Sequence, residues 1–294
     1  SSFVFIPEYY ATAADSTLTI EVKDGTAVVA RREVRAANGV PVAVELDDPK
    51  LWAPGNPHLY DLVFFVSSEA GEIDSVRSYA GLRKVHIEGN KVLLNNQPLY
   101  QRLVLDQGFY PDGIWTAPND GALKRDIELS MAAGFNGARL HQKVFEERFH
   151  YWADRLGYLT WGETSSWGLN LSTTEAARNF LSEWREIVVR DRNHPSIITW
   201  SPYNETQQNV ESPQHGRSHV DAYELTRSLD PSRPVNDSSG YIHYITDVYT
   251  VHNYTQDPDE LRGILDPARE GGVFRNFPEH DAAYAGQPYI IDEF

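Results

Sequence analysis

The feature that most constrains this chain is a regular alternation of strand-like and helical segments after about Leu94. The strand-like segments LYQRLVL, GARL, YLTWGE, IITWSPYNE, PVNDSSG, DVYTVHNY and PYIIDEF follow one another in this order. The amphipathic segments NDGALKRDIELSMAAG, VFEERFHYWADRLG, TEAARNFLSEWREIVVRDR and VDAYELTRSLD lie between the first five of them. Strands that alternate with helices pair in parallel through right-handed crossovers. We therefore expect a (β/α)8 barrel over residues 87–294, truncated after its seventh strand.

Residues 1–86 follow a different pattern. The segments STLTIEV, TAVVARREV, VPVAVEL, LYDLVFFV and DSVRSYA alternate apolar and polar residues, and the turn formers KDG, ANG, APGNP and EAGE separate them. A period of two between Gly, Pro and Asn is typical of antiparallel strands with one solvated face. Five or six such strands predict a small β-sandwich, a strand or two short of a full immunoglobulin-like domain.

Composition excludes several classes of function. The chain has a net charge of −16, from 42 Asp and Glu against 26 Lys and Arg. Such a surface repels nucleic acid, so no nucleic-acid partner is expected. Cysteine is absent, which removes disulfides, thiolate catalysis and zinc–thiolate sites.

The sequence gives no sign of a membrane or secretory segment. No apolar run is long enough to span a bilayer, so no membrane partner is expected. The first residues, SSFVFIPEYY, lack a basic start followed by a long apolar stretch. The expectation is a cytoplasmic protein, unless the true N-terminus has been cut away.

Polar side chains end the strands of the predicted barrel. In such barrels the active site lies at the carboxyl ends of the strands. The candidates are Asp106, Arg139, His141, Glu163, Asn204, Glu205, Asp237, His252, Tyr254 and Glu293.

Two of these candidates suit the hydrolysis of a glycosidic bond. That reaction needs two carboxyl groups on either side of the anomeric carbon, one protonated and one ionised. Glu205 ends the fourth strand and Glu293 ends the seventh. Because these strands face each other across the barrel mouth, the two side chains can converge over one sugar.

The chain resembles glycoside hydrolase family 2 over nearly its whole length. RDRNHPSIITWSPYNE resembles the signature around the family's acid/base residue, and LDPSRPVNDSSG, DVYTVHNY and PYIIDEF are similar to the segments that follow it. LWAPGNPHLYDLVFF and RSYAGLRKV resemble the end of the family's immunoglobulin-like domain. The resemblance implies an immunoglobulin-like domain over 1–86 followed by a TIM barrel.

The resemblance also implies roles for individual residues. Glu205 would protonate the leaving oxygen and then activate water, while Glu293 would attack the anomeric carbon. This is the retaining mechanism, for which carboxyl groups about 5–5.5 Å apart are expected. Asn204 would hydrogen-bond the sugar 2-hydroxyl, Arg139 would keep Glu293 ionised, and Tyr254 would hydrogen-bond the same carboxylate.

Five further residues are expected to contact substrate or support the site. Glu163 is the other acidic residue that could act as nucleophile, but a supporting role in the site is expected for it. Trp161 lies two positions before it, and His252 lies near the end of the sixth strand. His141 comes one position earlier than the histidine of the family pattern, so the sugar contact made by that histidine is not assigned to His141. Asp106 is expected to bind a sugar hydroxyl or coordinate an ion.

The resemblance predicts a retaining exo-β-glycosidase that acts on an oligosaccharide or glycoside, and favours β-galactosidase. The alternatives are β-glucuronidase, β-mannosidase or arabinosidase activity, or a catalytically silent carbohydrate-binding barrel. No cofactor or catalytic metal is expected, because too few histidines end the strands to form a metal centre. A structural Mg²⁺ or Na⁺ and a homo-oligomer both stay open.

Overall fold

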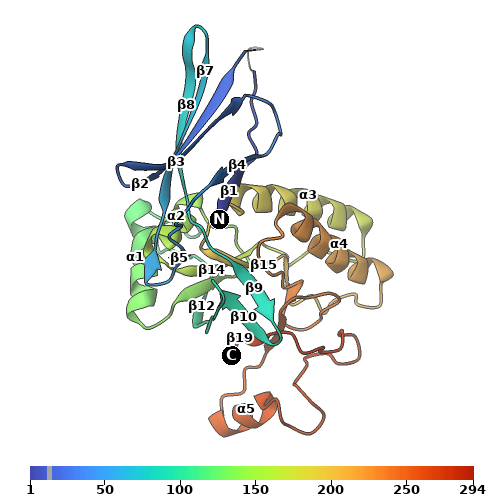
Figure 1. The fold of residues 1–294 in the computed structure, drawn as a ribbon. Helices are drawn as coiled ribbons and strands as arrows, with labels where there is room; N and C mark the ends of the chain where they lie inside the picture. The colour runs from blue at the N-terminus through green and yellow to red at the C-terminus, as the bar shows by residue number, and fades with distance from the viewer. Residues whose placement is uncertain (12–14) are drawn as a thin grey trace. The chain divides into compact units, whose positions relative to one another are not determined.

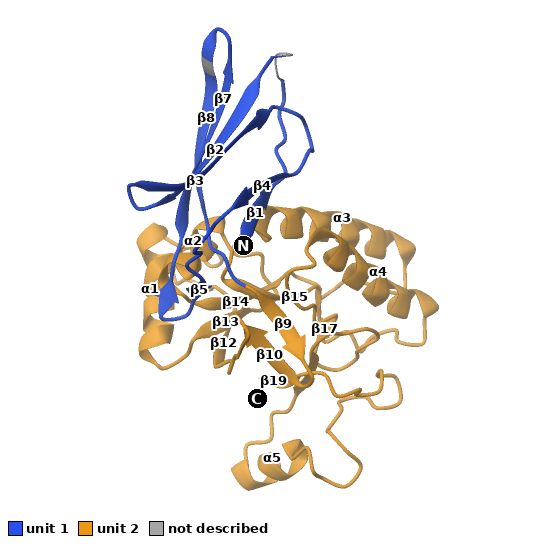
Figure 2. Ribbon diagram, viewed as in Figure 1, with its two compact units in different colours: residues 1–83 blue, residues 84–294 orange. Residues whose placement is uncertain are grey.

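The computed structural model describes residues 1–11 and 15–294. They form two compact units, Ser1–Arg83 and Lys84–Phe294, which are coloured separately in Figure 2. The division falls slightly before the expected boundary between residues 86 and 87. The reason is local: strand β9 (Val85–Glu88) pairs with strand β10 (Lys91–Leu94) inside the second unit.

The first unit contains two antiparallel sheets and a short hairpin. The larger sheet has the order β3-β2-β7-β8, the smaller pairs β1 with β4, and β5 pairs with β6. The strand bounds are β1 Ser2–Phe5, β2 Thr17–Asp24, β3 Ala27–Arg35, β4 Val42–Glu45, β5 Trp52–Ala53, β6 Asn56–Pro57, β7 Tyr60–Ser68 and β8 Gly71–Ala80. The strand β1 was not expected from the sequence.

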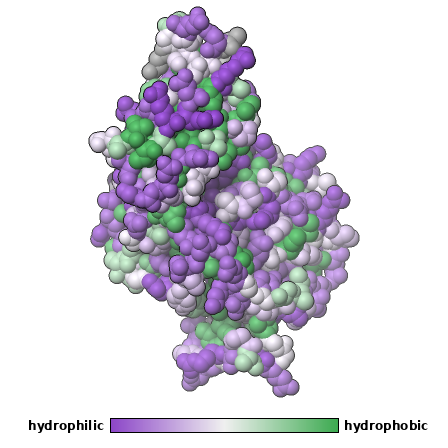
Figure 3. Space-filling model, viewed as in Figure 1, coloured by the Kyte–Doolittle hydropathy of each residue, from purple (hydrophilic) through white to green (hydrophobic). Residues whose placement is uncertain are grey.

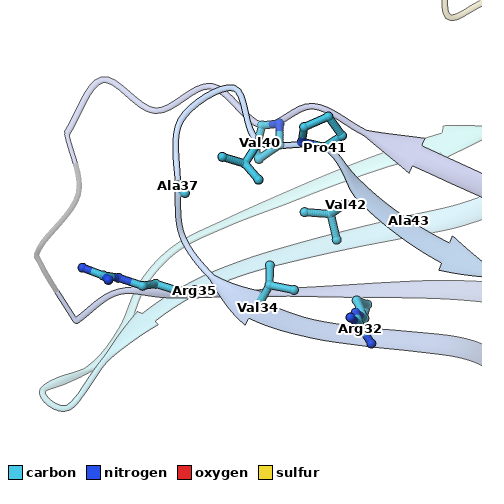
Figure 4. A pocket seen from close by; sticks show the side chains of 9 residues that line it. Arg32, Val34, Arg35, Ala37, Val40, Pro41, Val42 and Ala43 are labelled. Carbon is cyan, nitrogen blue, oxygen red and sulfur yellow. The ribbon is translucent and has the colours of Figure 1, made fainter.

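The core of this unit lies between its two sheets. Leu18, Ile20 and Val22 point from β2 toward Val42 and Val44 of β4, and all five side chains are buried. The alternate residues of β4 are exposed, as the period of two predicts. The unit is therefore a β-sandwich. A shallow hollow of about 170 Å³ opens at one end of it, between β3 and the turn that leads into β4 (Figure 4).

The second unit begins with a small antiparallel sheet of order β11-β10-β9, where β11 is Gln97–Pro98. Asn95 and Asn96, at φ +52° and +65°, form the two-residue turn between β10 and β11. Asparagine tolerates this left-handed backbone better than most residues, which is why an Asn pair suits the turn.

Parallel strands follow in chain order, as expected for a barrel. The first sheet has the order β12-β13-β14-β15, and the pairs β16-β17 and β18-β19 are also parallel. Their bounds are β12 Leu103–Asp106, β13 Gly137–Leu140, β14 Leu159–Glu163, β15 Ile197–Ser201, β16 Tyr203–Asn204, β17 Ser238–Ser239, β18 Tyr249–His252 and β19 Tyr289–Glu293. The expected fourth strand is split into β15 and β16 at Pro202, which has no N–H to donate.

The strands form an arc with β12 and β19 at its two ends. Every residue of β13, β14, β15 and β18 is buried, whereas all of β19 is only half-buried and Leu105 of β12 is exposed. Within the described residues, no strand pairs with the outer edge of β12 or of β19. The barrel is therefore open between these two strands.

Helices connect the strands, and the longer ones are grouped around the arc in Figure 1. They are α1 Asp120–Ala132, α2 Glu147–Leu156, α3 Thr174–Asp191 and α4 Pro213–Leu229. Helix α1 packs on α2 and α3 packs on α4. Trp184 of α3 packs edge to face on Trp200 of β15, and both are fully buried.

One helix boundary differs from the expectation, and one helix was not expected. Helix α4 begins at Pro213 rather than at Val220, because proline at the first helical position needs no hydrogen bond. A fifth helix, α5 (Pro258–Leu265), was not expected; Asp257 caps it by accepting from the N–H groups of Asp259 and Glu260. In Figure 1, α5 lies apart from the other helices on the connection between β18 and β19.

The outer surface is mostly polar. On the face drawn in Figure 3, hydrophilic residues cover most of both units, with small apolar patches between them. No helix in residues 1–11 and 15–294 is long and apolar enough to cross a membrane.

Candidate active site

Arg139 is the centre of the site. It is the second-last residue of β13, only 2% of its side chain is exposed, and it donates hydrogen bonds to three side chains. Its guanidinium donates to Oε2 of Glu163 at 2.9 Å, to Oε1 of Glu293 at 2.8 Å and to Oδ1 of Asn204 at 2.5 Å. Burial works against the charge, but the facing carboxylates outweigh it and raise the pKa of Arg139. The arginine thus ties together the ends of β13, β14, β16 and β19.

Glu205 and Glu293 meet beside this arginine. One carboxylate oxygen of each and one nitrogen of His252 all lie within 4.8 Å of one another. The hydroxyl of Tyr254 donates to Oε2 of Glu293 and lies 3.4 Å from Oε1 of Glu205. The two carboxylates therefore converge on one place although 88 positions separate them in the sequence.

His252 lies behind Glu205 rather than at the mouth of the site. Its Nδ1 is 2.9 Å from Oε1 of Glu205, and its side chain is fully buried. Burial alone would lower the pKa of His252, but hydrogen bonds to Asp292 and Glu205 raise it to about 9. Burial raises the pKa of Glu205, yet the hydrogen bond and charge of His252 outweigh it and hold that pKa below its ordinary value.

Three residues that follow strand ends adopt left-handed backbone. Gln142 after β13, Glu205 after β16 and Tyr241 after β17 have φ values of +54°, +51° and +62°. Residues other than glycine rarely adopt this conformation, and such strain concentrates at functional sites. In this left-handed conformation the backbone N–H of Gln142 donates to Glu163 Oε1 at 3.0 Å.

Asp292 is a site residue that the sequence analysis missed. Side chains alternate along a strand, so the residue before Glu293 should face away from it. A register shift between β18 and β19 changes this: Val251 pairs with Ile291, and His252 pairs with Glu293. Asp292 is the extra residue, its side chain is only 4% exposed, and it faces His252 and Arg139.

The remaining expected residues lie near the two glutamates to different degrees. His141 is buried, with Nδ1 at 2.8 Å from the amide of Gln107 and Nε2 at 3.7 Å from Glu293 Oε1. Burial and the charge of Arg139 lower the pKa of His141 to about 4. Asp106 ends β12 and accepts from the Gly108 N–H at 2.8 Å.

The structure does not bring every strand-end candidate to the site. Trp161 is fully buried and donates its indole N–H to Gln101 at 2.8 Å. Asp237 is buried in an ion pair with His243 at 2.7 Å. Within the described residues, neither side chain hydrogen-bonds Glu205 or Glu293.

The loop residues beside the site carried no signal in the sequence. Gln107 holds His141, and Gln142 accepts from the backbone N–H groups of Ser166 and Trp167. Each of these glutamines lies one or two positions beyond a strand end, so scanning only the final strand residue overlooks it.

Glu205, His252 and Glu293 have the residue types and spacing of a metal-ligand set. Their hydrogen bonds argue for an ion-pair cluster instead. A histidine that ligates a metal offers it a lone pair, whereas Nδ1 of His252 lies against Oε1 of Glu205 and Nε2 against Ser239 and Asp292. Both ring nitrogens are thus used toward oxygen partners.

Paired carboxylates at the carboxyl ends of parallel barrel strands define a class of protein, the barrel-type glycoside hydrolases. Comparison with known proteins agrees. Residues 85–294 match the model "Glycosyl hydrolases family 2, TIM barrel domain" and residues 8–83 match "Glycosyl hydrolases family 2". The chain belongs to glycosyl hydrolase family 2, with an immunoglobulin-like unit followed by a TIM-barrel unit.

Curated relatives carry the name β-galactosidase. The chain is 31% identical to one from Vibrio vulnificus over 205 residues, which are 67% of this chain and 19% of that protein. It is 28% identical to one from Lactococcus lactis over 69% of this chain and 20% of that protein. The chain thus spans about a fifth of the length of these relatives.

Several solved structures that resemble the chain are described as β-glucuronidases. A β-D-glucuronidase from Dictyoglomus thermophilum superposes with a TM-score of 0.72 and 25% identity, over 84% of this chain and 44% of that one. A β-glucuronidase from Ruminococcus gnavus gives a TM-score of 0.72 at 23% identity, over 83% of this chain and 45% of that one, which supports the fold alone.

Proposed function

We propose that the protein is a retaining exo-β-glycosidase that uses Glu205 as proton donor and Glu293 as nucleophile. The observation that carries the proposal is that one carboxylate oxygen of Glu205 lies within 4.8 Å of one of Glu293, which Arg139 hydrogen-bonds. The retaining mechanism needs carboxyl groups about 5–5.5 Å apart, too close for an intervening water, and this approach supports it.

The two steps balance as a double displacement. An oxygen of Glu293 attacks the anomeric carbon, the bond to the leaving oxygen breaks, and the proton of Glu205 moves to that oxygen. A glycosyl ester on Glu293 and a free alcohol result. Glu205 then takes a proton from water, whose oxygen attacks the same carbon and releases Glu293 as a carboxylate.

The side chains around Glu293 and Asn204 fit the roles proposed for them. Arg139 and Tyr254 both donate hydrogen bonds to Glu293, which fixes the orientation of its carboxylate beside the site. Asn204 directs its carbonyl oxygen at Arg139, and its buried amide nitrogen has no partner within the described part of the chain. An unpaired buried donor beside Glu205 suits a sugar 2-hydroxyl, because leaving it unpaired is costly.

We propose a neutral β-galactoside as substrate, with a β-glucuronide as the alternative. Among the residues that the structure describes, the cationic partners of Glu163, Glu205, Asp292 and Glu293 are Arg139 and His252. This acidic surplus repels the carboxylate of a glucuronide, and the relatives from Vibrio and Lactococcus are named β-galactosidases. The alternative rests on the likeness to the Dictyoglomus enzyme.

We further propose that the site works in a closed (β/α)8 barrel. The half-buried β19 and the partly exposed β12 leave room for an eighth parallel strand between them. Unpaired edge groups of both strands would then be satisfied.

A panel of nitrophenyl β-glycosides tests the function with the full-length protein. The expected result is hydrolysis of the β-galactoside with the β-anomer as first product, read by proton NMR before mutarotation. Preference for the glucuronide selects the alternative sugar. Cleavage of no β-glycoside favours a carbohydrate-binding barrel without catalysis, and an α-anomer as first product rules out double displacement.

A further inference from the structure

A hollow of about 260 Å³ lies beside Glu205 in the second unit. Its walls come from the loop after β14 and from the residues that follow β16. They are Ser166, Trp167, Gly168, Leu169, Leu171, Asn204, Glu205, Thr206, Gln207 and Gln208. Glu205 is part of this lining and Glu293 is not, so the hollow lies on the donor side of the carboxylate pair.

The walls combine one aromatic face with amide groups. Trp167 is 59% exposed as a whole residue, and its backbone N–H donates to the Gln142 amide oxygen at 3.2 Å. The His141 ring packs against it edge to face, with ring centroids 5.3 Å apart. Gln207 and Gln208 on the opposite segment are exposed. A sugar ring presents an apolar face to an aromatic side chain and hydroxyls to amides, so this lining suits a pyranose.

We propose that this hollow binds the leaving-group sugar of the substrate, with Trp167 as its stacking platform. The inference rests on the proposed function, because a proton donor must touch the oxygen of the departing unit. A residue on the donor side, away from the nucleophile, therefore faces the leaving group. The substrate class it implies is an oligosaccharide rather than a glycoside with a small alkyl leaving group.

Trp167→Ala tests this inference with two substrates that share the same transferred sugar. For a β-linked disaccharide we expect kcat/KM to fall about tenfold, the loss of one good stacking contact. For the glycosyl fluoride, whose leaving group is a single atom, we expect no change. Trp115→Ala is the matched control, since Trp115 is 47% exposed but does not line the hollow.

Two outcomes overturn the inference: an equal loss on both substrates, or no loss on the disaccharide. A wild-type protein that cleaves the fluoride but no disaccharide also overturns it while sparing the proposed function. If wild type cleaves neither substrate, the proposed function fails, and calorimetric titration with the disaccharide decides between the two variants: Trp167→Ala must weaken binding and Trp115→Ala must not.

A second, independent observation concerns His252. Its Nε2 lies 3.1 Å from Ser239 Oγ and 3.2 Å from Asp292 Oδ1, while Nδ1 lies 2.9 Å from Glu205 Oε1. Ser239 Oγ in turn donates to Oδ2 of Asp292 at 2.5 Å. A buried chain of hydrogen bonds thus joins the proposed proton donor to the strand of the proposed nucleophile.

The surroundings fix the ring of His252 in place. A Cβ on Gly240 would come within 2.5 Å of the ring, so the backbone there touches the imidazole closely. Asn276 accepts from the backbone N–H of His252 at 3.1 Å and donates to its carbonyl at 2.8 Å. The ring of Tyr241 lies 5.4 Å away. The imidazole therefore has a single position.

Charged and titratable groups face His252 from three strands or the residues that follow them. Glu205 faces it after β16, Asp292 and Glu293 face it from β19, and Arg139 and His141 approach from β13. With a pKa of about 9, raised by Asp292 and Glu205 against the effect of burial, the ring is an imidazolium at neutral pH. Both nitrogens are then donors, so Glu205 Oε1 must accept.

We propose that His252, held by Asp292, is a positioning residue that reserves Oε1 of Glu205 as an acceptor and leaves Oε2 to carry the transferred proton. This inference also rests on the proposed function. It has a consequence for pH dependence: a fixed positive charge beside the donor lowers the pKa of Glu205, so the donor loses its proton at lower pH. Removing the charge must shift the basic limb of the pH profile upward.

His252→Asn keeps an N–H group near the position of Nδ1 but removes the charge. We expect the basic limb of kcat/KM against pH to move up by about one unit or more. Asp292→Asn should shift the limb in the same direction. Asp237→Asn is the matched control, because it breaks another buried His–Asp pair that does not touch Glu205. It should lower the thermal midpoint without moving the limb.

The positioning role is overturned if the basic limb of the pH profile does not move in His252→Asn, or if it moves equally in Asp237→Asn. Nitrogen NMR of the wild-type imidazole supplies a readout that needs no activity. The inference predicts that both ring nitrogens of His252 are protonated at neutral pH, and a neutral ring there contradicts it. Loss of all glycosidase activity with a protonated His252 would instead count against the proposed function.

Discussion

Replacing Arg139 by glutamine should destabilise the second unit strongly and in a pH-dependent way. The guanidinium compensates Glu163 and Glu293 at 2.9 and 2.8 Å, and its side chain is only 2% exposed. Removing one partner of a buried ion pair costs about 3–5 kcal/mol, since the remaining charge is buried without compensation. For a unit of this size, that lowers the midpoint of thermal unfolding by about 6–20 °C.

The pH dependence has a definite sign. Burial already raises the pKa of Glu163, and Arg139 opposes that rise. Without the arginine the folded pKa rises further. A carboxyl with a raised folded pKa loses stability as the pH increases through that value. The deficit of Arg139→Gln should therefore be larger near pH ~8 than near pH ~5.

Thermal unfolding followed by tryptophan emission measures this effect, because Trp161, Trp184 and Trp200 are buried in the second unit. Adding Glu163→Gln to Arg139→Gln should restore part of the loss, with a coupling energy of about 0.5–3 kcal/mol. A deficit below about 1 kcal/mol, or one that grows toward acid pH, would refute the reasoning.

Arg233→Gln serves as the control for this experiment. Arg233 is equally buried and pairs with Asp230 at 2.7 Å, away from the two glutamates. It should also destabilise the unit, but its effect should add to that of Glu163→Gln without coupling. If Arg233→Gln and Glu163→Gln showed a coupling energy of similar size, the double-mutant comparison would be reporting a general loss of packing rather than the Arg139–Glu163 ion pair.

Three further predictions concern catalysis. Glu293→Gln should abolish turnover while calorimetry still detects binding of the product sugar. Glu205→Ala should spare the first step for glycosyl fluorides, and azide should restore release of the glycosyl group; equal losses for all leaving groups would refute its role as donor. Because His252 lowers the pKa of Glu205, kcat/KM should be highest on the acid side of neutrality, which a pH profile with a poor leaving group checks.

The barrel strands could be predicted because they carry their pattern locally. Segments such as GARL and YLTWGE are short and lack the apolar–polar alternation of half-exposed strands, as is typical of strands buried on both faces, and they became β13 and β14. The start of α4 was wrong because the sequence around Pro213 is polar and gives no amphipathic period. Helix α5 was overlooked for a related reason: it is short, and none of its residues is buried.

The proximity of Glu205 and Glu293 could be predicted from strand order alone, whereas the environment of His252 could not. Strand order fixes which side chains share the barrel mouth. The depth of a side chain depends on register, and the shift between β18 and β19 turned Asp292 inward beside His252. A one-residue irregularity of this kind leaves no mark on the hydrophobic pattern, so the buried chain from Glu205 to Asp292 emerged only with the structure.

The most direct test of the paired-carboxylate account is to find where a sugar becomes attached during the reaction. A 2-deoxy-2-fluoro glycosyl fluoride of the preferred sugar forms the ester but releases it slowly. Peptide mass spectrometry of the inactivated protein should place the added mass on Glu293. Attachment to Glu163 or Glu205, or rapid turnover of an active enzyme with no labelled peptide, would contradict the account.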